Sequence, residues 1–250
     1  MQKVSQNDIE WLLQSKDEFN PSRLSASSNS KSRTASPQKR RSIGYYLSGF
    51  LFMAVSLVIL PFFILIRTAV YLNISEQWNA WGALLGGTGA CIVFLSLLFF
   101  FVFRKVKNKK MMAKLSVSAV SMLVGGFIIY GLLYLNSVNA KSDEIREVYR
   151  SLHPILRVAV TSTTLADNEL VITDISRTQD DYIAMGLTPR QSSMHYVQPT
   201  GFVHAIDLRT IGHSELRNIS LEWGLKLMGF QTIRHVGTAD HLHVALPLSN

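Results

Sequence analysis

Cysteine is nearly absent from this chain of 250 residues, where Cys91 is the only one. A lone cysteine excludes the internal disulfide framework on which many small secreted domains depend. The chain holds seven histidines, and none of them lies in the first 150 residues. Charged side chains are missing from three long apolar runs, 43–66, 81–103 and 115–135. The sequence is therefore divided into an apolar part and a C-terminal part that contains every histidine.

Each of the three uncharged runs is long enough to cross a lipid bilayer. A hydrocarbon core needs about 20 helical residues, and one charge at its centre would cost about 2.5–3.5 kcal/mol. Buried helices of a soluble protein would not explain three such runs so close together. The sequence therefore predicts an α-helical membrane anchor over residues 43–135, with three transmembrane helices at 43–66, 81–103 and 115–135.

Basic residues are unevenly spread around these runs. Residues 1–42 carry eight lysines and arginines against four acids, the loop 104–114 carries six without an acid, and the loop 67–80 has one charge of each sign. Because cytoplasmic loops are enriched in Lys and Arg, the N-terminus is predicted to be cytoplasmic. Three crossings then place residues 136–250 on the extracytoplasmic side of the membrane. The net charge of +8 reflects this topology. It does not indicate nucleic-acid binding, which would need a basic face on the folded domain.

The cytoplasmic tail, residues 1–42, divides into two pieces. Asn7 or Asp8 could cap a short helix that ends near Phe19 and carries Trp11. Two interpretations have equal weight: the helix docks on a cytoplasmic partner or on the membrane surface, or it is a marginal, frayed helix. Residues 21–42 are rich in Ser and basic side chains, which is typical of a disordered linker. No cleavable signal peptide is expected, because 42 mostly polar residues precede the first apolar run.

Residues 136–250 are enough for one compact domain. Apolar spacing predicts three helices: Asp143 to about Thr163 with a bend or split at Pro154, Asp180 to Met185, and Ser214 as N-cap to Met228 with Gly229 after it. It predicts four strands: Leu170–Ile172, Phe202–Leu208, Gln231–Val236 and His241–Leu246. The last helix would turn a stripe of Leu216, Ile219, Trp223 and Leu227 toward the core. The fold class is thus a small α+β domain with a mostly antiparallel sheet, attached to the membrane anchor.

Three short motifs in this domain carry metal-binding side chains: Ser193-Met194-His195, Ala205-Ile206-Asp207 and Asp240-His241-Leu242-His243. Two imidazoles and one carboxylate are ligands that a catalytic zinc ion takes, and the fourth position is left for water. An isolated His-x-His pair is more often a surface feature of a strand. The order of the three motifs favours a metal site.

Together with the segment Ile172–Gln179, these motifs resemble the D-Ala-D-Ala carboxypeptidase-like zinc peptidases. That family includes the peptidase M15 group, phage endolysins and other peptidoglycan peptidases, and the hedgehog-type fold is related to it. The resemblance covers about residues 145–247. It implies that His195, Asp207 and His243 bind Zn²⁺, that Asp240 is the general base, and that Arg177 faces the substrate.

Two further histidines, His241 and His204, are candidates for the site. On a regular strand His241 shares a face with His243, so it could line the site and donate a hydrogen bond to the tetrahedral intermediate. His204 also lies close to Asp207 in sequence and is an alternative metal ligand.

Eleven residues separate His195 from Asp207, which is more than the family's compact pattern has. Such an interval is tolerable if the chain loops out, because the cost of closing a loop grows slowly with its length.

Two functional hypotheses follow from the sequence. The first is a membrane-anchored zinc peptidase that hydrolyses peptide bonds of peptidoglycan stem peptides, as a carboxypeptidase or an endopeptidase. The second is a non-catalytic envelope protein that retains a peptidase-like fold for binding or assembly. The long interval between His195 and Asp207 favours the second hypothesis, whereas the complete Asp240–His243 segment favours the first.

Overall fold

The computed structural model describes residues 43–103, 105–186, 188, 191–237 and 240–248. The predicted N-terminal helix and linker in 1–42 lie outside the described residues. Contacts divide the chain into two units, Met1–Ser48 and Gly49–Asn250. The contacts discussed below lie within the second unit.

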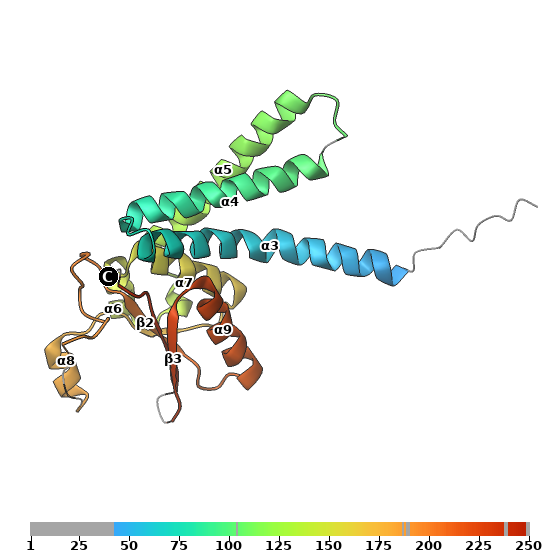
Figure 1. The fold of residues 1–250 in the computed structure, drawn as a ribbon. Helices are drawn as coiled ribbons and strands as arrows, with labels where there is room; N and C mark the ends of the chain where they lie inside the picture. Colours follow the sequence, from blue (N-terminus) through green and yellow to red (C-terminus); the bar gives the residue numbers. More distant parts are fainter. Residues whose placement is uncertain (1–42, 104, 187, 189–190, 238–239, 249–250) are drawn as a thin grey trace, which may run out of the picture. The chain divides into compact units, whose positions relative to one another are not determined.

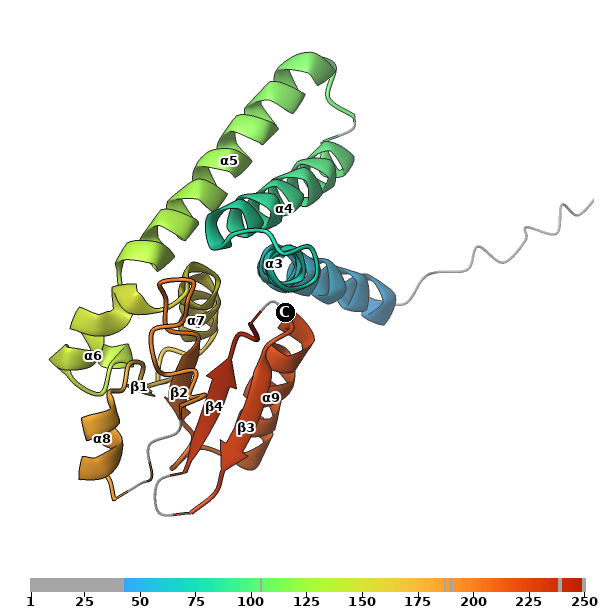
Figure 2. The same cartoon turned by 60° about the vertical axis from the view of Figure 1, so that its left-hand side comes forward.

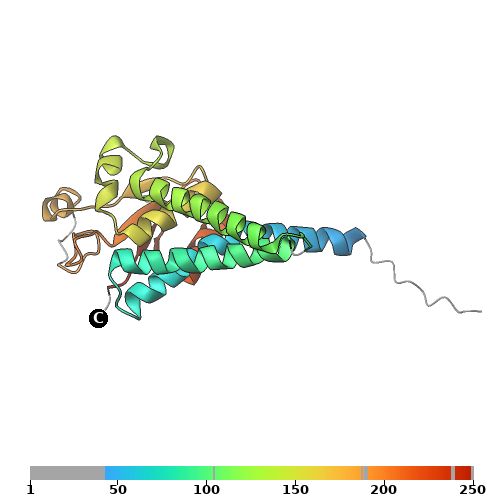
Figure 3. The same cartoon turned by 90° about the horizontal axis from the view of Figure 1, so that it is seen from above.

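Three long helices occupy the apolar part of the chain: α3 (Ile43–Ile74), α4 (Ala80–Val102) and α5 (Lys109–Leu133). All three are long and apolar enough to cross a membrane. Asn79 and Asn108 cap α4 and α5, because their side chains accept hydrogen bonds from the Gly82 and Met111 amides. α4 and α5 lie side by side (Figures 1 and 3).

α3 continues to Ile74, beyond the predicted end of the first apolar run at residue 66. This end of α3 is packed against protein, and Leu65, Ile66, Ala69 and Val70 are buried. A methyl group on Gly87 of α4 would lie 2.3 Å from the Leu65 carbonyl oxygen, so glycine allows this close approach. The prediction stopped early because it followed uncharged residues, whereas a helix past the apolar run can be stabilised by packing.

The helices of the C-terminal part follow the predicted order. A short 3₁₀ turn, η1 (Ser137–Asn139), leads to α6 (Asp143–Val148), η2 (Tyr149–Ser151), α7 (Pro154–Ala166), α8 (Gln179–Ala184) and α9 (Glu215–Met228). The predicted split at Pro154 is confirmed, since proline has no amide hydrogen and is tolerated in the first turn of α7. Ser214 and Gly229 bound α9 as predicted, and Gly229 adopts a left-handed φ of 103°.

The C-terminal part also contains a four-stranded antiparallel sheet, in the order β1-β2-β4-β3 (Figure 2). Its strands are β1 (Ile172–Asp174), β2 (Ala205–Arg209), β3 (Gln231–His235) and β4 (His241–Ala245). The register places Asp207 opposite His243 and Arg209 opposite His241. Because partners in register point to the same face, three side chains that the motifs singled out, Asp207, His241 and His243, belong to one face of the sheet.

The opposite face of the sheet forms the core. Ile206, Leu208, Leu242 and Val244 are buried there and belong to the same cluster as Ile155 and Leu156 of α7. α7 also packs against α4 and α5. At this junction the Tyr149 hydroxyl donates to the Gly131 carbonyl at 2.8 Å, and Arg157 Nη1 donates to the Leu132 carbonyl at 2.7 Å. These bonds satisfy carbonyls in the last turn of α5 that have no partner within the helix.

The predicted core-facing stripe of α9 was wrong. Leu216, Ile219, Trp223 and Leu227 are exposed, by 76%, 41%, 59% and 60%. The buried side of α9 instead carries Asn218 and Leu225, with Leu221 and Met228 partly buried against the core. Two apolar stripes run along this helix on opposite sides, and spacing alone does not tell which one faces the sheet.

Candidate metal centre

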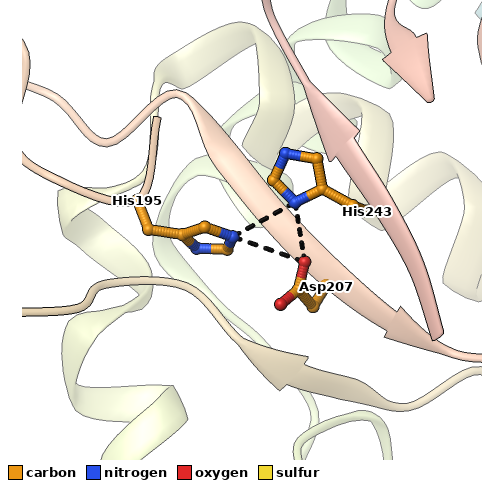
Figure 4. A group of neighbouring side chains, drawn as sticks. All are labelled: His195, Asp207 and His243. Carbon is orange, nitrogen blue, oxygen red and sulfur yellow. Dashed lines mark hydrogen bonds and ion pairs between the residues drawn. The ribbon is translucent and has the colours of Figure 1, made fainter. Parts of the chain in front are cut away.

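The structure brings together the three predicted metal ligands. His195 Nε2 lies 3.3 Å from Asp207 Oδ1 and 3.2 Å from His243 Nδ1, and His243 Nδ1 lies 2.8 Å from Asp207 Oδ1. Figure 4 shows the two rings and the carboxylate pointing toward one another. Among the described residues this is the one group of three or more acidic, histidine or cysteine side chains with metal-binding spacing.

Two of the three spacings between these atoms are close to those of a tetrahedral zinc site. Zinc takes nitrogen and oxygen ligands at about 2.0–2.2 Å in a tetrahedron, so neighbouring ligand atoms should lie about 3.4 Å apart. Both distances from His195 are close to this value. The shorter contact between His243 and Asp207 has the length of a hydrogen bond, which metal binding would replace.

Local structure determines which nitrogen His195 presents. Its Nδ1 lies 2.7 Å from the Ile175 carbonyl oxygen. A carbonyl oxygen only accepts hydrogen bonds, so Nδ1 carries a proton and Nε2 is the nitrogen that would bind a metal. A backbone carbonyl on the other ring nitrogen is a common arrangement around metal-binding histidines. His195 Nε2 is then the nitrogen that faces Asp207, at 3.3 Å from Oδ1.

The sheet and one loop position the three ligands. Asp207 on β2 and His243 on β4 are register partners. His195 comes from the segment after α8, which is tied to the rest of the domain at both sides: the Arg177 amide donates to the His195 carbonyl, and the His204 amide donates to the Met194 carbonyl. The position of His195 is therefore fixed by backbone hydrogen bonds.

The long interval between His195 and Asp207 is taken up by a small hairpin. Val197 and Val203 form an antiparallel bridge, and the Gln198 amide donates to the Phe202 carbonyl at 2.8 Å. Gly201 has a φ of 80°, a left-handed conformation that glycine adopts without strain. The hairpin begins and ends at neighbouring points, so the additional residues do not separate the two ligands.

Arg177 holds the second oxygen of Asp207. Its Nη2 lies 2.5 Å from Asp207 Oδ2, and its Nε lies 2.5 Å from Asp174 Oδ2. Burial opposes the charge of this guanidinium, but Asp207 and Asp174 outweigh burial and raise the pKa of Arg177. Because Oδ2 is held in this way, Oδ1 is left toward the two histidines. The sequence predicted Arg177 to face a substrate, and its side chain retains 17% exposure.

The charge of Asp207 is secured by the same neighbours. Burial alone would raise the pKa of this carboxyl group. Hydrogen bonds with His195 and His243 and the positive charge of Arg177 outweigh burial and hold the pKa well below its usual range. Asp207 is therefore an anion at neutral pH, the form that binds a metal.

His241 lies at the edge of the cluster. Its Nε2 is 3.9 Å from Asp207 Oδ2, and its ring stacks on His235 of β3 with centroids 4.7 Å apart. The sequence assigned His235 no site role, although the register of β3 and β4 pairs it with His241. The Ile175 carbonyl was also missed. A backbone carbonyl carries no residue-type signal that a motif search could find.

Asp240, the predicted general base, has other partners in the described part of the chain. Its carboxylate accepts from Thr210 Oγ1 at 2.5 Å and from Arg234 Nη2 at 3.4 Å. The Thr210 hydrogen bond is the main reason that the pKa of Asp240 is lowered. Arg234 pairs with the buried Leu242 in the register of β3 and β4, so its contact with Asp240 lies away from the face that His241 and His243 share. The structure does not bring Asp240 to the three ligands.

His204, the alternative ligand, is also kept from the cluster by strand alternation. Its Nε2 lies 2.7 Å from Thr200 Oγ1 and its Nδ1 lies 3.2 Å from the Leu246 carbonyl oxygen. Its ring packs against His153, with centroids 4.7 Å apart. Both nitrogens of His204 thus have partners on the core side of β2.

The three ligands differ in their access to solvent. The side chains of His195 and Asp207 are 3% exposed, whereas that of His243 is 21% exposed. A catalytic zinc site differs from a structural one in having an open position, and a partly exposed ligand allows one.

No protein-family model, curated protein or solved structure matches this chain.

Proposed function

We propose that this protein is a membrane-anchored zinc-dependent peptidase of the bacterial envelope. The observation that carries the proposal is the convergence of His195 Nε2, Asp207 Oδ1 and His243 Nδ1 with a spacing that zinc accepts. The motif order, which resembles the D-Ala-D-Ala carboxypeptidase-like peptidases, is the reason to propose peptide bonds of peptidoglycan stem peptides as the substrate. Carboxypeptidase and endopeptidase activities both fit this arrangement.

The location follows from the anchor. Three helices are long and apolar enough to cross a membrane, and lysines and arginines are concentrated in 1–42 and in the loop 104–114. By the positive-inside rule, the metal centre would lie on the periplasmic side of the inner membrane, where peptidoglycan is found.

The residues around the site have distinct roles in this mechanism. A bound zinc ion supplies an activated water molecule and polarises the carbonyl group of the scissile bond. His195, Asp207 and His243 would hold the ion, and Arg177 would keep Asp207 ionised and turned toward it. The guanidinium is partly exposed, and it can also bind a substrate carboxylate.

The proton has to be moved by a group near the ligands. His241 lies beside Asp207, and in this proposal it would donate to the oxygen of the tetrahedral intermediate. Asp240 would first have to leave Thr210 and Arg234. Replacing His241 with Gln and Asp240 with Asn separates the two roles. The variant that lacks the proton-carrying residue should bind zinc but no longer hydrolyse the substrate. The other variant should keep most of its activity.

Metal content tests the proposal directly. The full-length protein, purified without a histidine tag and reconstituted with zinc, should contain about one zinc per chain by elemental analysis. His195→Ala should lose this zinc. The zinc-loaded protein should release shorter stem peptides from peptidoglycan. A folded protein that binds no zinc would contradict the metal site, and full zinc binding in His195→Ala would contradict the ligand assignment.

A second candidate function is a non-catalytic envelope protein that binds peptidoglycan or assembles with another protein. The placement of Asp240 favours it, because its contacts with Thr210 and Arg234 hold this predicted base away from the ligands. A zinc-loaded protein that retains peptidoglycan on a column but cleaves none of it would support this candidate over the peptidase.

A further inference from the structure

α9 has an apolar stripe that no described part of the protein covers. Leu216, Ile219, Trp223 and Leu227 follow one another at steps of three and four residues, which places them on one side of the helix. Each is between 41% and 76% exposed. Leu225, on the opposite side, is buried in the core. The stripe is therefore an apolar surface that the fold of the domain does not use.

The end of α9 lies against α3. Gly229, which ends α9, approaches so closely that a methyl group on its Cα would lie 2.5 Å from Arg67 Nη1 and 2.8 Å from Val70 Cγ1. Leu225 and Phe230 belong to the same buried cluster as Leu65 and Val70. Figure 2 shows α9 alongside β3, so the helix is fixed between the sheet and α3.

This contact sets the distance of α9 from the apolar part of α3. The run Leu57–Leu60 of α3 is between 38% and 59% exposed, as expected of side chains that face lipid. Arg67 follows Leu60 by seven residues, which is about 10 Å of helix. Arg67 is also the first charged residue after the uncharged run. If α3 crosses a bilayer, the end of α9 lies at the level of the headgroups.

The side chains of the stripe suit that level. Trp223 is an aromatic residue of the kind enriched at membrane–water interfaces. Lys226 Nζ lies 5.6 Å from the centroid of the Trp223 ring and pairs with Glu222. Long basic side chains beside an apolar stripe can lie along it and keep their charge in water. An apolar stripe bordered by charged residues is typical of helices that lie in the plane of a membrane surface.

We infer that the stripe Leu216-Ile219-Trp223-Leu227 inserts into the headgroup region of the bilayer that α3 crosses. The occupant of this surface is phospholipid. α9 then rests on the membrane and holds the sheet, with its metal centre, at a fixed height above it. This inference depends on α3 crossing the membrane and is independent of metal binding and of hydrolysis.

Nitroxide labels on the full-length protein test the inference. In a Cys91→Ala background, Leu216→Cys and Leu227→Cys place labels on the stripe, and Ile183→Cys on α8, 64% exposed, is the matched control. The protein is placed in nanodiscs of phosphatidylcholine and phosphatidylglycerol that contain one chain each. Collision rates are measured with oxygen, which concentrates in lipid, and with a water-soluble nickel complex.

The ratio of oxygen to nickel collision rates should be several-fold higher at Leu216 and Leu227 than at Ile183. Nickel collision rates as high on the stripe as at Ile183 would show that the stripe faces water and would overturn the inference. In discs that contain two copies, a second chain could cover the stripe instead of lipid. Protection of the labels from both reagents there, together with magnetic coupling between the labels of the two chains, would assign the stripe to a second copy. Ile219→Cys reports on the same stripe if Leu216→Cys does not fold, as judged by circular dichroism.

Discussion

Two pairs of neighbouring histidines lie on opposite faces of the sheet and have different surroundings. The rings of His153 and His204 have centroids 4.7 Å apart on the core side. The rings of His195 and His243 have centroids 5.0 Å apart on the other side. Only the second pair shares an anion, the carboxylate of Asp207, with nitrogens directed toward it. Both pairs thus have neighbouring imidazoles, and the carboxylate of Asp207 is what distinguishes the candidate metal centre from the core-side pair.

The core-side pair is held as two neutral rings. Burial, the neighbouring His204 and the charge of Arg157 lower the pKa of His153 to about 3. His153 Nδ1 accepts a hydrogen bond from the Ile155 amide and caps α7. Burial also lowers the pKa of His204. This pair serves packing and helix capping, which are structural roles.

The largest predicted effect is a difference in zinc binding between a variant of one face and a variant of the other. Asp207→Asn removes the anion with little change of shape and should abolish zinc binding, because both histidines would keep only a neutral partner. His204→Gln should still bind about one zinc per chain, at some cost in thermal stability. Elemental analysis of both proteins measures the difference. Equal zinc content in the two variants would remove the distinction between the faces.

A smaller effect should follow from loss of the residue that holds Asp207. Arg177→Gln leaves all three ligands in place but frees Asp207 Oδ2, and zinc affinity should fall by about 10–100-fold, as for other residues that orient metal ligands. Competition with a chelator measures the change. Arg209→Gln, two residues after Asp207 on the same strand, is the matched control and should leave affinity unchanged. The role of Arg177 would be refuted by equal affinities.

The smallest effect concerns the core-side pair and pH. His153 is neutral in the folded state, with a pKa of about 3, whereas an unfolded histidine has a pKa near 6.5. Protonation therefore favours the unfolded state, and stability is retained above pH 6.5 and lost as the pH falls toward 3. The loss is about 1.4 kcal/mol per pH unit. His153→Asn keeps a capping side chain without this titration, so its stability should fall less between pH 6 and pH 5.

Chemical unfolding of the full-length protein in detergent at several pH values measures this slope. His204 is left in place, so part of the pH dependence should persist in the variant. An unchanged slope in His153→Asn would mean that His153 is already protonated in the folded protein or that it is neutral in both states.

Local signals were sufficient for much of this fold. Pro154 marked the start of a helix, Ser214 and Gly229 marked the ends of another, and the motifs identified His195, Asp207 and His243, which come together in space. The direction of a side chain at the edge of a strand was not available from the sequence. Asp240 precedes β4, whose predicted start at His241 is confirmed, so alternation along the strand does not fix its direction. Contacts with Thr210 and Arg234, which are far from it or on another strand, determine where its carboxylate points.

The face of α9 could not be predicted for a different reason. Leu221, Leu225 and Met228 form one apolar stripe, and the residues from Leu216 to Leu227 described above form another on the opposite side. Helical spacing is satisfied by both stripes. Contact with β3 and with α3 determines which of them is buried, and these contacts join residues that are far apart in the sequence.

The order of strands in the sheet has a consequence for biosynthesis. β4 follows β1, β2 and β3 in the chain but lies between β2 and β3. During synthesis β2 and β3 emerge before the strand that joins them. Asp207 on β2 can therefore approach His243 only after β4 has been made, and long-range pairing of this kind is slow. An ion that binds only the completed set would stabilise the sheet through mass action. Metal capture would thus lock the last strand in place, and metal supply would influence how much of the protein matures.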